Sequence, residues 1–366
     1  NIFGEKFGSK PEYFLPDVFD ADIDRLKQLY NENGFFDINI SHNYLLNSDS
    51  TRSDITIVIQ ENLRTGIVDI VYKGLEGIEP KILDQILLEP IIKKGAPYQK
   101  RTINDEAYRI LDIIMNNGYP FARILSDSSS ASRYYSTNKI KVTYAFSIQK
   151  QFKFGEITIS VVPYREDITE NIIYKQLDFK KGEWISKNKI SSSEKSLNKL
   201  GVFEAARIEV QQDSSSFGKY ERPVDIFVRA RNKEELAPEV LISDEDNTFN
   251  LGIGAGYTNH NFFGDARSFN SRIRLSTQAI QEWNFKRIFG KGGLSDPTIL
   301  GKVELQLQLT QPSLFTKTLN GLLTMSLTVD KKNFYVGTIA RNKIGLVNQF
   351  ATYTTGYFDW TLERSN

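Results

Sequence analysis

The chain has 366 residues, with 46 lysines and arginines against 45 aspartates and glutamates, and no cysteine. Its net charge of +1 argues against a nucleic-acid or other polyanion-binding protein. The lack of cysteine excludes disulfides, thiolate metal sites and cysteine nucleophiles. Only His42 and His260 could supply imidazole, and neither has a second candidate ligand near it in the sequence. We therefore expect no metal, no cofactor and no enzymatic activity.

One phrase occurs three times at a nearly constant spacing. In each copy an amphipathic helix ends at a glycine, Gly34, Gly118 or Gly201, and a strand follows. The glycines are 84 and 83 residues apart (118 − 34 and 201 − 118). A period of this length that carries helix and strand signals together indicates a tandem array of small α+β domains.

The middle unit shows the order of elements most completely. It predicts, in chain order, a strand over 67–72, a helix over 80–88, a second helix capped by Thr102, a strand from Phe121, and, after a serine-rich loop, a strand over 140–146. The order is β-α-α-β-β, and the third unit repeats it. We expect the first unit to be incomplete and to begin near the end of its first helix.

The pattern changes to strands alone after Arg231. Residues 232–246 hold four glutamates, two aspartates and Pro238, which favours a polar connector. Beyond the connector, apolar and polar residues alternate, most regularly over 303–310. This alternation predicts about six strands, near 249–257, 267–279, 300–311, 320–330, 334–342 and 350–362.

Strands of this length with one apolar and one polar face are typical of a transmembrane β-barrel. A soluble β-sandwich is the alternative, because half-buried strands also alternate, although their usual length is only about 5 to 6 residues. Six strands are too few to close, since barrels start at about 8. We therefore expect an incomplete barrel in this chain.

The β-α-α-β-β units with Asn-Gly-Phe or Asn-Gly-Tyr after the second helix resemble POTRA domains. The strand F-N-L-G-I-G-A-G-Y-T-N (249–259) and the turn N-F-F-G (261–264) resemble the first barrel strand and turn of the BamA/TamA superfamily. The Asn-, Ile- and Lys-rich composition is similar to that of Bacteroidetes proteins. The resemblance implies an outer-membrane protein whose periplasmic POTRA array receives unfolded substrates, and whose barrel inserts them into the membrane or moves them across it.

The predicted fold class is therefore α+β tandem POTRA repeats (β-α-α-β-β) followed by antiparallel strands of a transmembrane β-barrel, incomplete in this chain. The predicted domains are a partial POTRA domain (1–64), two POTRA domains (65–150 and 151–232), a connector (233–247) and the N-terminal part of the barrel (248–366).

The resemblance implies unfolded outer-membrane proteins, outer-membrane lipid and accessory periplasmic or lipoprotein subunits as partners, and no nucleic acid. Two other functions stay open: a two-partner secretion pore, and a POTRA-barrel anchor for an enzyme domain upstream. A general assembly factor and a TamA-like specialist are not distinguished.

The expected mechanism is backbone pairing, because an exposed sheet edge can capture extended chains of many sequences. In the barrel we expect the seam strand to bind substrate through Phe249, Asn250, Leu251, Gly252, Ile253, Gly254, Ala255, Gly256 and Tyr257. In the POTRA domains we expect edge strands formed by Phe121, Ala122, Arg123, Ile124, Ala206, Arg207, Ile208, Glu209 and Val210.

The three glycines of the seam strand leave its backbone approachable, which would ease exchange of one partner strand for another. The alternative is that they relieve crowding in a narrow barrel. For the POTRA edges the alternative is an ordinary structural strand that a neighbouring domain shields.

Overall fold

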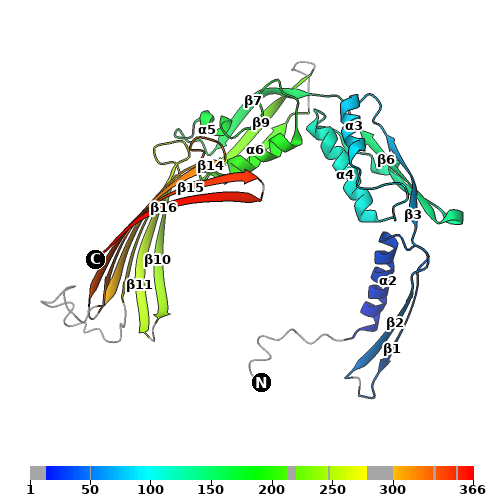
Figure 1. Cartoon of the computed structure of the whole chain (residues 1–366), viewed down its shortest axis with the longest axis horizontal. Coiled ribbons are helices and arrows are strands. Elements are labelled where there is room, and N and C mark those ends of the chain that lie inside the picture. Colours follow the sequence, from blue (N-terminus) through cyan, green and yellow to red (C-terminus); the bar gives the residue numbers. More distant parts are fainter. Residues whose placement is uncertain are drawn as a thin grey trace. The chain divides into compact units, whose positions relative to one another are not determined.

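The computed structural model of the chain describes residues 14–49, 51–212, 220–245, 248–277, 300–332, 335–351 and 353–366. The chain divides into two compact units, residues 1–152 with 184–187, and residues 153–183 with 188–366. Figure 1 shows the chain coloured from blue at the N-terminus to red at the C-terminus, with many of its helices and strands labelled. Among the described residues, no helix is both long enough and apolar enough to cross a membrane.

The first module of the first unit is a helix with a two-stranded antiparallel sheet. Its elements are α2 (Pro16–Glu32), β1 (Asn39–Leu46) and β2 (Ser53–Gln60). The helix buries Phe19 and Ile23, and the Phe19 ring lies 5.2 Å from the ring of His42 on β1. Gly34 follows the helix with φ +94°, a left-handed conformation that glycine adopts without strain.

The second module has the predicted β-α-α-β-β order with one added strand. Its main elements are β3 (Gly66–Lys73), α3 (Pro80–Leu88), α4 (Lys100–Asn116), β4 (Arg123–Ile124), β5 (Ser130–Tyr134) and β6 (Lys139–Ser147), with short 3-10 turns over Ser126–Ser128 and Tyr135–Thr137. Strand β6 lies between β3, which is parallel to it, and β4 with β5, which are antiparallel. Ile86, Ile110, Ile114 and Ile140 form the centre of its core.

Two details of the second module differ from the prediction. Thr102 does not cap α4; it lies inside the first turn, because Gln99 is the residue with extended backbone before the helix, and the Thr102 hydroxyl donates to the Gln99 carbonyl at 2.9 Å. The serine-rich segment is not only a loop, since Ser130–Tyr134 pairs with β6. Serine side chains do not prevent pairing of an exposed edge strand.

The third module repeats the β-α-α-β-β order. Its elements are β7 (Lys153–Val162), α5 (Glu170–Tyr174), α6 (Lys187–Lys199), β8 (Phe203–Val210) and β9 (Glu221–Ala230). The sheet order is β7-β9-β8, with β7 parallel and β8 antiparallel to the central β9. Phe154, Ile173, Leu197 and Val224 are fully buried, which gives this short module a core of its own.

The rest of the second unit is a seven-stranded antiparallel sheet in sequential order. Its strands are β10 (Glu234–Glu245), β11 (Thr248–Asn259), β12 (Ser268–Thr277), β13 (Gly301–Gln311), β14 (Leu319–Lys331), β15 (Val336–Ala351) and β16 (Thr354–Ser365). In the described part of the chain, β10 and β16 pair on one side only, so the sheet is not closed. This confirms the predicted fold class, an α+β array followed by an incomplete antiparallel sheet.

The predicted connector is wrong for residues 234–245, which form strand β10 and pair with β11 along their whole length. The four glutamates and Pro238 concealed an alternation in which Leu236, Val240 and Ile242 share one face. Proline is tolerated because β10 lies at the edge of the sheet, where a missing N–H removes no ladder bond. The break predicted between 342 and 350 is also absent, since β15 runs through it.

The sheet has one apolar and one polar face. Successive strands pair in register, so each row of side chains crosses the sheet on the same side. One row holds Val240, Ile253, Leu275 and Val303, which are 74%, 61%, 45% and 42% exposed. The adjacent row holds Glu239, Gly254, Arg274, Glu304 and Thr328. A band of exposed branched aliphatic side chains this wide is unusual for a surface in water.

Candidate functional site

The predicted seam segment, residues 249–257, lies within β11 and is paired on both sides, with β10 and with β12. The expectation that it forms the edge of the sheet is therefore wrong, because the residues taken for a connector occupy that place. A role of these nine residues in binding substrate stays a prediction.

The glycines of β11 make room for neighbouring side chains. A Cβ on Gly252 would lie 2.9 Å from the Leu275 carbonyl oxygen and 3.2 Å from the Leu241 side chain. A Cβ on Gly254 would lie 2.8 Å from the Ile273 carbonyl oxygen and 3.1 Å from Arg274 Cγ. Crowding thus accounts for these two glycines, and valine at either position would push the strands apart.

The predicted edge of the second module is shorter than expected. Only Arg123 and Ile124 form a strand, paired with the end of β6, and Phe121 and Ala122 precede it. Ala122 is buried, and the Phe121 ring packs 5.7 Å from that of Phe152. Two residues are too few to align an extended chain, so the longer β5 dominates this side of β6.

The predicted edge of the third module is a strand edge, since β8 pairs with β9 alone in the three-stranded sheet of the described module. Its outward backbone groups are nevertheless occupied by side chains of α6. The Ala206 N–H donates to Asn198 Oδ1 at 2.8 Å, and Asn198 Nδ2 donates to the Ala206 carbonyl at 3.1 Å. The Ile208 N–H donates to Glu194 Oε1 at 2.7 Å. An incoming strand would need these same groups.

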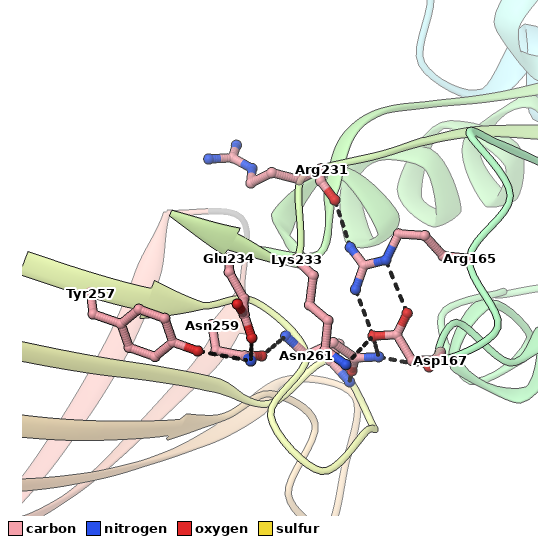
Figure 2. Close-up of polar contacts among 9 residues, drawn as sticks. Arg165, Asp167, Arg231, Lys233, Glu234, Tyr257, Asn259 and Asn261 are labelled. Atoms are coloured by element: carbon pink, nitrogen blue, oxygen red, sulfur yellow. Dashed lines mark hydrogen bonds and ion pairs between the residues drawn. The ribbon is translucent and has the colours of Figure 1, made fainter. Parts of the chain in front are cut away.

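A polar cluster joins the third module to the turn between β11 and β12 (Figure 2). Arg165 donates to both carboxylate oxygens of Asp167, at 3.0 and 2.6 Å, and to the Arg231 carbonyl at 2.5 Å. Asn261, in the turn after β11, donates to Asp167 Oδ2 at 3.0 Å and to the Asp167 carbonyl at 2.6 Å. Lys233 Nζ lies 3.7 Å from the same carboxylate.

The hydrogen bonds from Arg165, and after them that from Asn261, lower the pKa of Asp167 from 3.8 to about 2. Partial burial acts in the opposite direction and is outweighed. Asp167 is thus ionised throughout the neutral range, and it ties the loop after β7 to the turn between β11 and β12.

Two further turns of the sheet contact the same module. Lys317, between β13 and β14, pairs with Asp178 at 2.7 Å and also donates to the Gln176 carbonyl. Lys199, at the end of α6, donates to Gln349 near the end of β15 at 2.6 Å. A cavity of ≈ 430 Å³ lies among these turns and the module. The third module is therefore fixed to the sheet at several turns.

The two histidines do not form a metal site. His42 Nε2 lies 3.1 Å from Asp20 Oδ1, and His260 Nε2 lies 3.2 Å from Glu235 Oε1. Among the described residues, no group of three or more His, Cys, Asp or Glu side chains could hold a metal ion.

Sequence reasoning missed two sets of residues: the side chains of α6 that cap β8, and the Arg165–Asp167 pair. Asn198 belongs to the repeated phrase before Gly201, and Asn261 to the Asn-Phe-Phe-Gly turn. Both asparagines were thus part of recognised motifs. Their hydrogen-bond partners lie on other elements, and no local pattern indicates them.

A family model supports the POTRA prediction for the N-terminal part of the chain. The model of the POTRA domain, described as "Surface antigen variable number repeat", matches residues 4–62. The match falls within residues 1–64, which are predicted from the sequence as a partial POTRA domain. No curated protein matches the chain.

Solved structures that resemble the chain come from the superfamily that its sequence resembles. POTRA domains 3–5 of BamA from Haemophilus influenzae match with a TM-score of 0.40 and 16% identity, over 62% of this chain and 89% of that one. BamA from Haemophilus ducreyi lacking POTRA domains 1–3 matches with a TM-score of 0.45 and 11% identity, over 83% and 63%. CdiB from Acinetobacter baumannii matches with a TM-score of 0.33 and 10% identity, over 98% and 72%. At these identities and TM-scores the likenesses do not identify an activity.

Proposed function

We propose that this chain is part of an outer-membrane protein insertase or assembly factor of the BamA or TamA kind. Its POTRA-like modules lie in the periplasm and receive unfolded outer-membrane proteins, and its sheet lies in the outer membrane and inserts them. The observation that carries the proposal is the sheet itself, whose exposed apolar face continues in register across its strands. In a lipid bilayer such a face is buried, whereas in water it would promote aggregation.

The polar face suits the inside of a barrel. Arg272, Arg274, Glu304, Arg341 and Lys343 line a hollow of ≈ 340 Å³ on that face. Charged side chains of both signs that face a hollow are typical of the water-filled interior of a membrane barrel, where they avoid contact with hydrocarbon.

The edge that pairs with substrate is β10 in this proposal, rather than the segment 249–257 expected from the sequence. Strand β10 is 12 residues long and pairs only with β11 in the described sheet. Its outward side can add an antiparallel strand through main-chain hydrogen bonds, which accept many sequences. Each substrate strand with the same alternation would then continue the two faces of the sheet.

The modules contribute by holding extended segments before insertion. The edge of β8 is available to a substrate only when Asn198 and Glu194 release Ala206 and Ile208. Accessory periplasmic or lipoprotein subunits are further expected partners, as is outer-membrane lipid.

Site-specific crosslinking tests the proposal, and the chain offers a cysteine-free background. A cysteine at Ser243, at the end of β10, should form a disulfide with a matching cysteine in a stalled outer-membrane substrate. A cysteine at Ser326 of β14, which is paired on both sides, should not. Equal crosslinking at the two positions would exclude β10 as the pairing edge.

A cellular experiment separates the proposal from the secretion-pore alternative. Depletion of the protein should lower the levels of many unrelated outer-membrane proteins. If depletion instead abolishes the export of one partner protein and leaves outer-membrane composition unchanged, the chain is a dedicated secretion pore.

A further inference from the structure

A glutamate of the edge strand is held by two arginines that lie two strands away. Glu239 of β10 accepts from Arg274 of β12 at 2.7 Å and lies 3.0 Å from Arg272 Nε. Strand β11 runs between β10 and β12 and pairs with both. The ion pairs therefore pass over an entire intervening strand.

The glycines of β11 make this reach possible. Glu239 is opposite Gly254, and Gly254 is opposite Arg274, so the three positions form one row on the polar face. A Cβ on Gly254 would lie 3.1 Å from Arg274 Cγ and 3.5 Å from Glu239 Cβ. A side chain there would occupy the space in which the acid and the guanidinium meet.

Gly252 and Gly256 extend the empty space above Gly254 into a trough along the polar face of β11. A Cβ on Gly252 would lie 3.2 Å from Leu241 Cδ1, and one on Gly256 would lie 3.9 Å from Ala237 Cβ. Ala237, Glu239 and Leu241 are residues of β10 on the polar face, and they lie beside three residues that have no side chain. Their side chains pack over the trough, and Glu239 alone among them forms an ion pair with β12.

Charge balance also depends on Glu239. Arg272 and Arg274 point to the same face two residues apart, and their side chains are 47% and 33% exposed. Glu239, 22% exposed, lies against both. Without its charge the two guanidinium groups would repel each other while β10 lost its tie to β12.

We propose that Glu239 is a latch: through Arg272 and Arg274 it holds β10 in register on β11 and thereby sets how readily the edge strand exchanges partners. The latch is a property of the sheet by itself. Its consequence for substrate insertion rests on the proposed function. In this proposal the glycines of β11 leave room for the ion pairs of Glu239, and their role is not to weaken the pairing of β11.

Hydrogen exchange of the full-length protein in lipid nanodiscs, without substrate, tests the latch. Glu239→Gln keeps the shape of the side chain and removes its charge, and it should raise exchange of the β10 amides about tenfold relative to the parent. Gly254→Ala keeps every charge but fills the trough, and it should loosen the same amides. The matched control is Glu363→Gln on β16, whose partner Arg341 lies directly opposite on the adjacent strand; β10 exchange should stay at the parent value. If Glu239→Gln leaves β10 exchange unchanged, or if Glu363→Gln raises it equally, the latch is wrong.

A second measurement separates the latch from the proposed function. Crosslinking of the Ser243 cysteine to a stalled substrate should increase several-fold in the Glu239→Gln background. If β10 exchange rises while crosslinking stays constant, the latch is real but does not control substrate pairing. If the parent protein forms no crosslink and Glu239→Gln still raises exchange, the proposed function fails and the latch stands.

Discussion

The second unit contains two strand edges that are closed in different ways. At β8, in the third module, a neighbouring helix supplies Asn198 and Glu194, which bond to the outward backbone groups of Ala206 and Ile208. At β10, none of the hydrogen bonds between described residues reaches the outer side of the strand, and the Glu239 tie acts from within the sheet. An incoming chain must displace side chains from β8, whereas in the described sheet the outward main chain of β10 carries no such side-chain caps. Under the proposed function, the two edges would therefore hold a substrate for different lengths of time.

Both arrangements solve the same physical problem, since an uncovered edge pairs with any extended chain. Side chains that mimic a strand block pairing at a cost of a few hydrogen bonds and can be displaced locally. An edge that is left open needs other protection, and on β10 Pro238 and the glutamates provide it by discouraging pairing with wrong partners.

The largest effect is expected from a test of whether the sheet that contains β10 lies in a membrane. Leu305 and Leu327 are opposite each other in the apolar rows, and arginine at either should cost roughly 2 to 4 kcal/mol of folding free energy near the bilayer midplane. Thr328 is the better control on the polar face, because it is opposite Glu304, which would pair with an added arginine. Gln306 is a poorer control, since Arg272 is opposite it. Folding titrations into lipid vesicles measure both variants, and equal losses on the two faces would favour a soluble sandwich.

The next largest effect is expected from weakening the junction between the third module, which contains β8, and the sheet, which contains β10. Asp167→Asn removes the charge that holds Arg165, Asn261 and Lys233 together. The pKa of Asp167 is lowered from 3.8 to about 2, and this shift corresponds to at most about 2 kcal/mol of stability. Trypsin cleavage after Arg231 or Lys233 should accelerate about tenfold, because cleavage requires local opening. Asp112→Asn, which removes an exposed pair with Lys187, is the control. Unchanged cleavage in Asp167→Asn would show that the other turn contacts suffice.

The sign of the pH dependence follows from the same shift. A carboxyl group whose pKa is lowered by folding contributes stability above its unfolded pKa, and the contribution is lost as the pH falls through the folded value. The junction should therefore be unaffected by pH above about 4 and should weaken between about pH 4 and pH 2. Cleavage by pepsin across this range measures it, with Asp167→Asn as a reference that should lack this component.

Periodic sequence patterns made much of this architecture predictable. The hydrogen bonds between separate helices and strands could not be predicted in this way. The glycine-ended helices and the alternation over 303–310 are local patterns, so the modules and most sheet strands could be placed from the sequence. Strand β10 was missed because its four glutamates and Pro238 outweighed the alternation of Leu236, Val240 and Ile242. For the same reason the predicted seam segment, residues 249–257, lies one strand inside the edge of the described sheet. The caps on β8 depend on where α6 lies beside the sheet, which single-sequence patterns do not specify.

The smallest expected effect opens the β8 edge and makes it more like β10. The double variant Asn198→Ala with Glu194→Ala removes three hydrogen bonds from outward backbone groups of β8, two of them exposed and the one at Ile208 partly buried. Water can replace bonds at an open edge, so the expected cost in stability is only about 1 kcal/mol. A cysteine at Arg207, whose side chain is 76% exposed, should then crosslink several-fold more to an extended substrate peptide than it does in the capped parent.

Asn117→Ala is the matched control. Asn117 lies in the second module and donates to the carbonyl four residues before it, as Asn198 does. A parent that already crosslinks as strongly as the double variant would mean that the caps do not close the edge. A double variant that gains nothing would mean that β8 is a structural strand, and the contrast with β10 would then be one between a pairing edge and a non-pairing one.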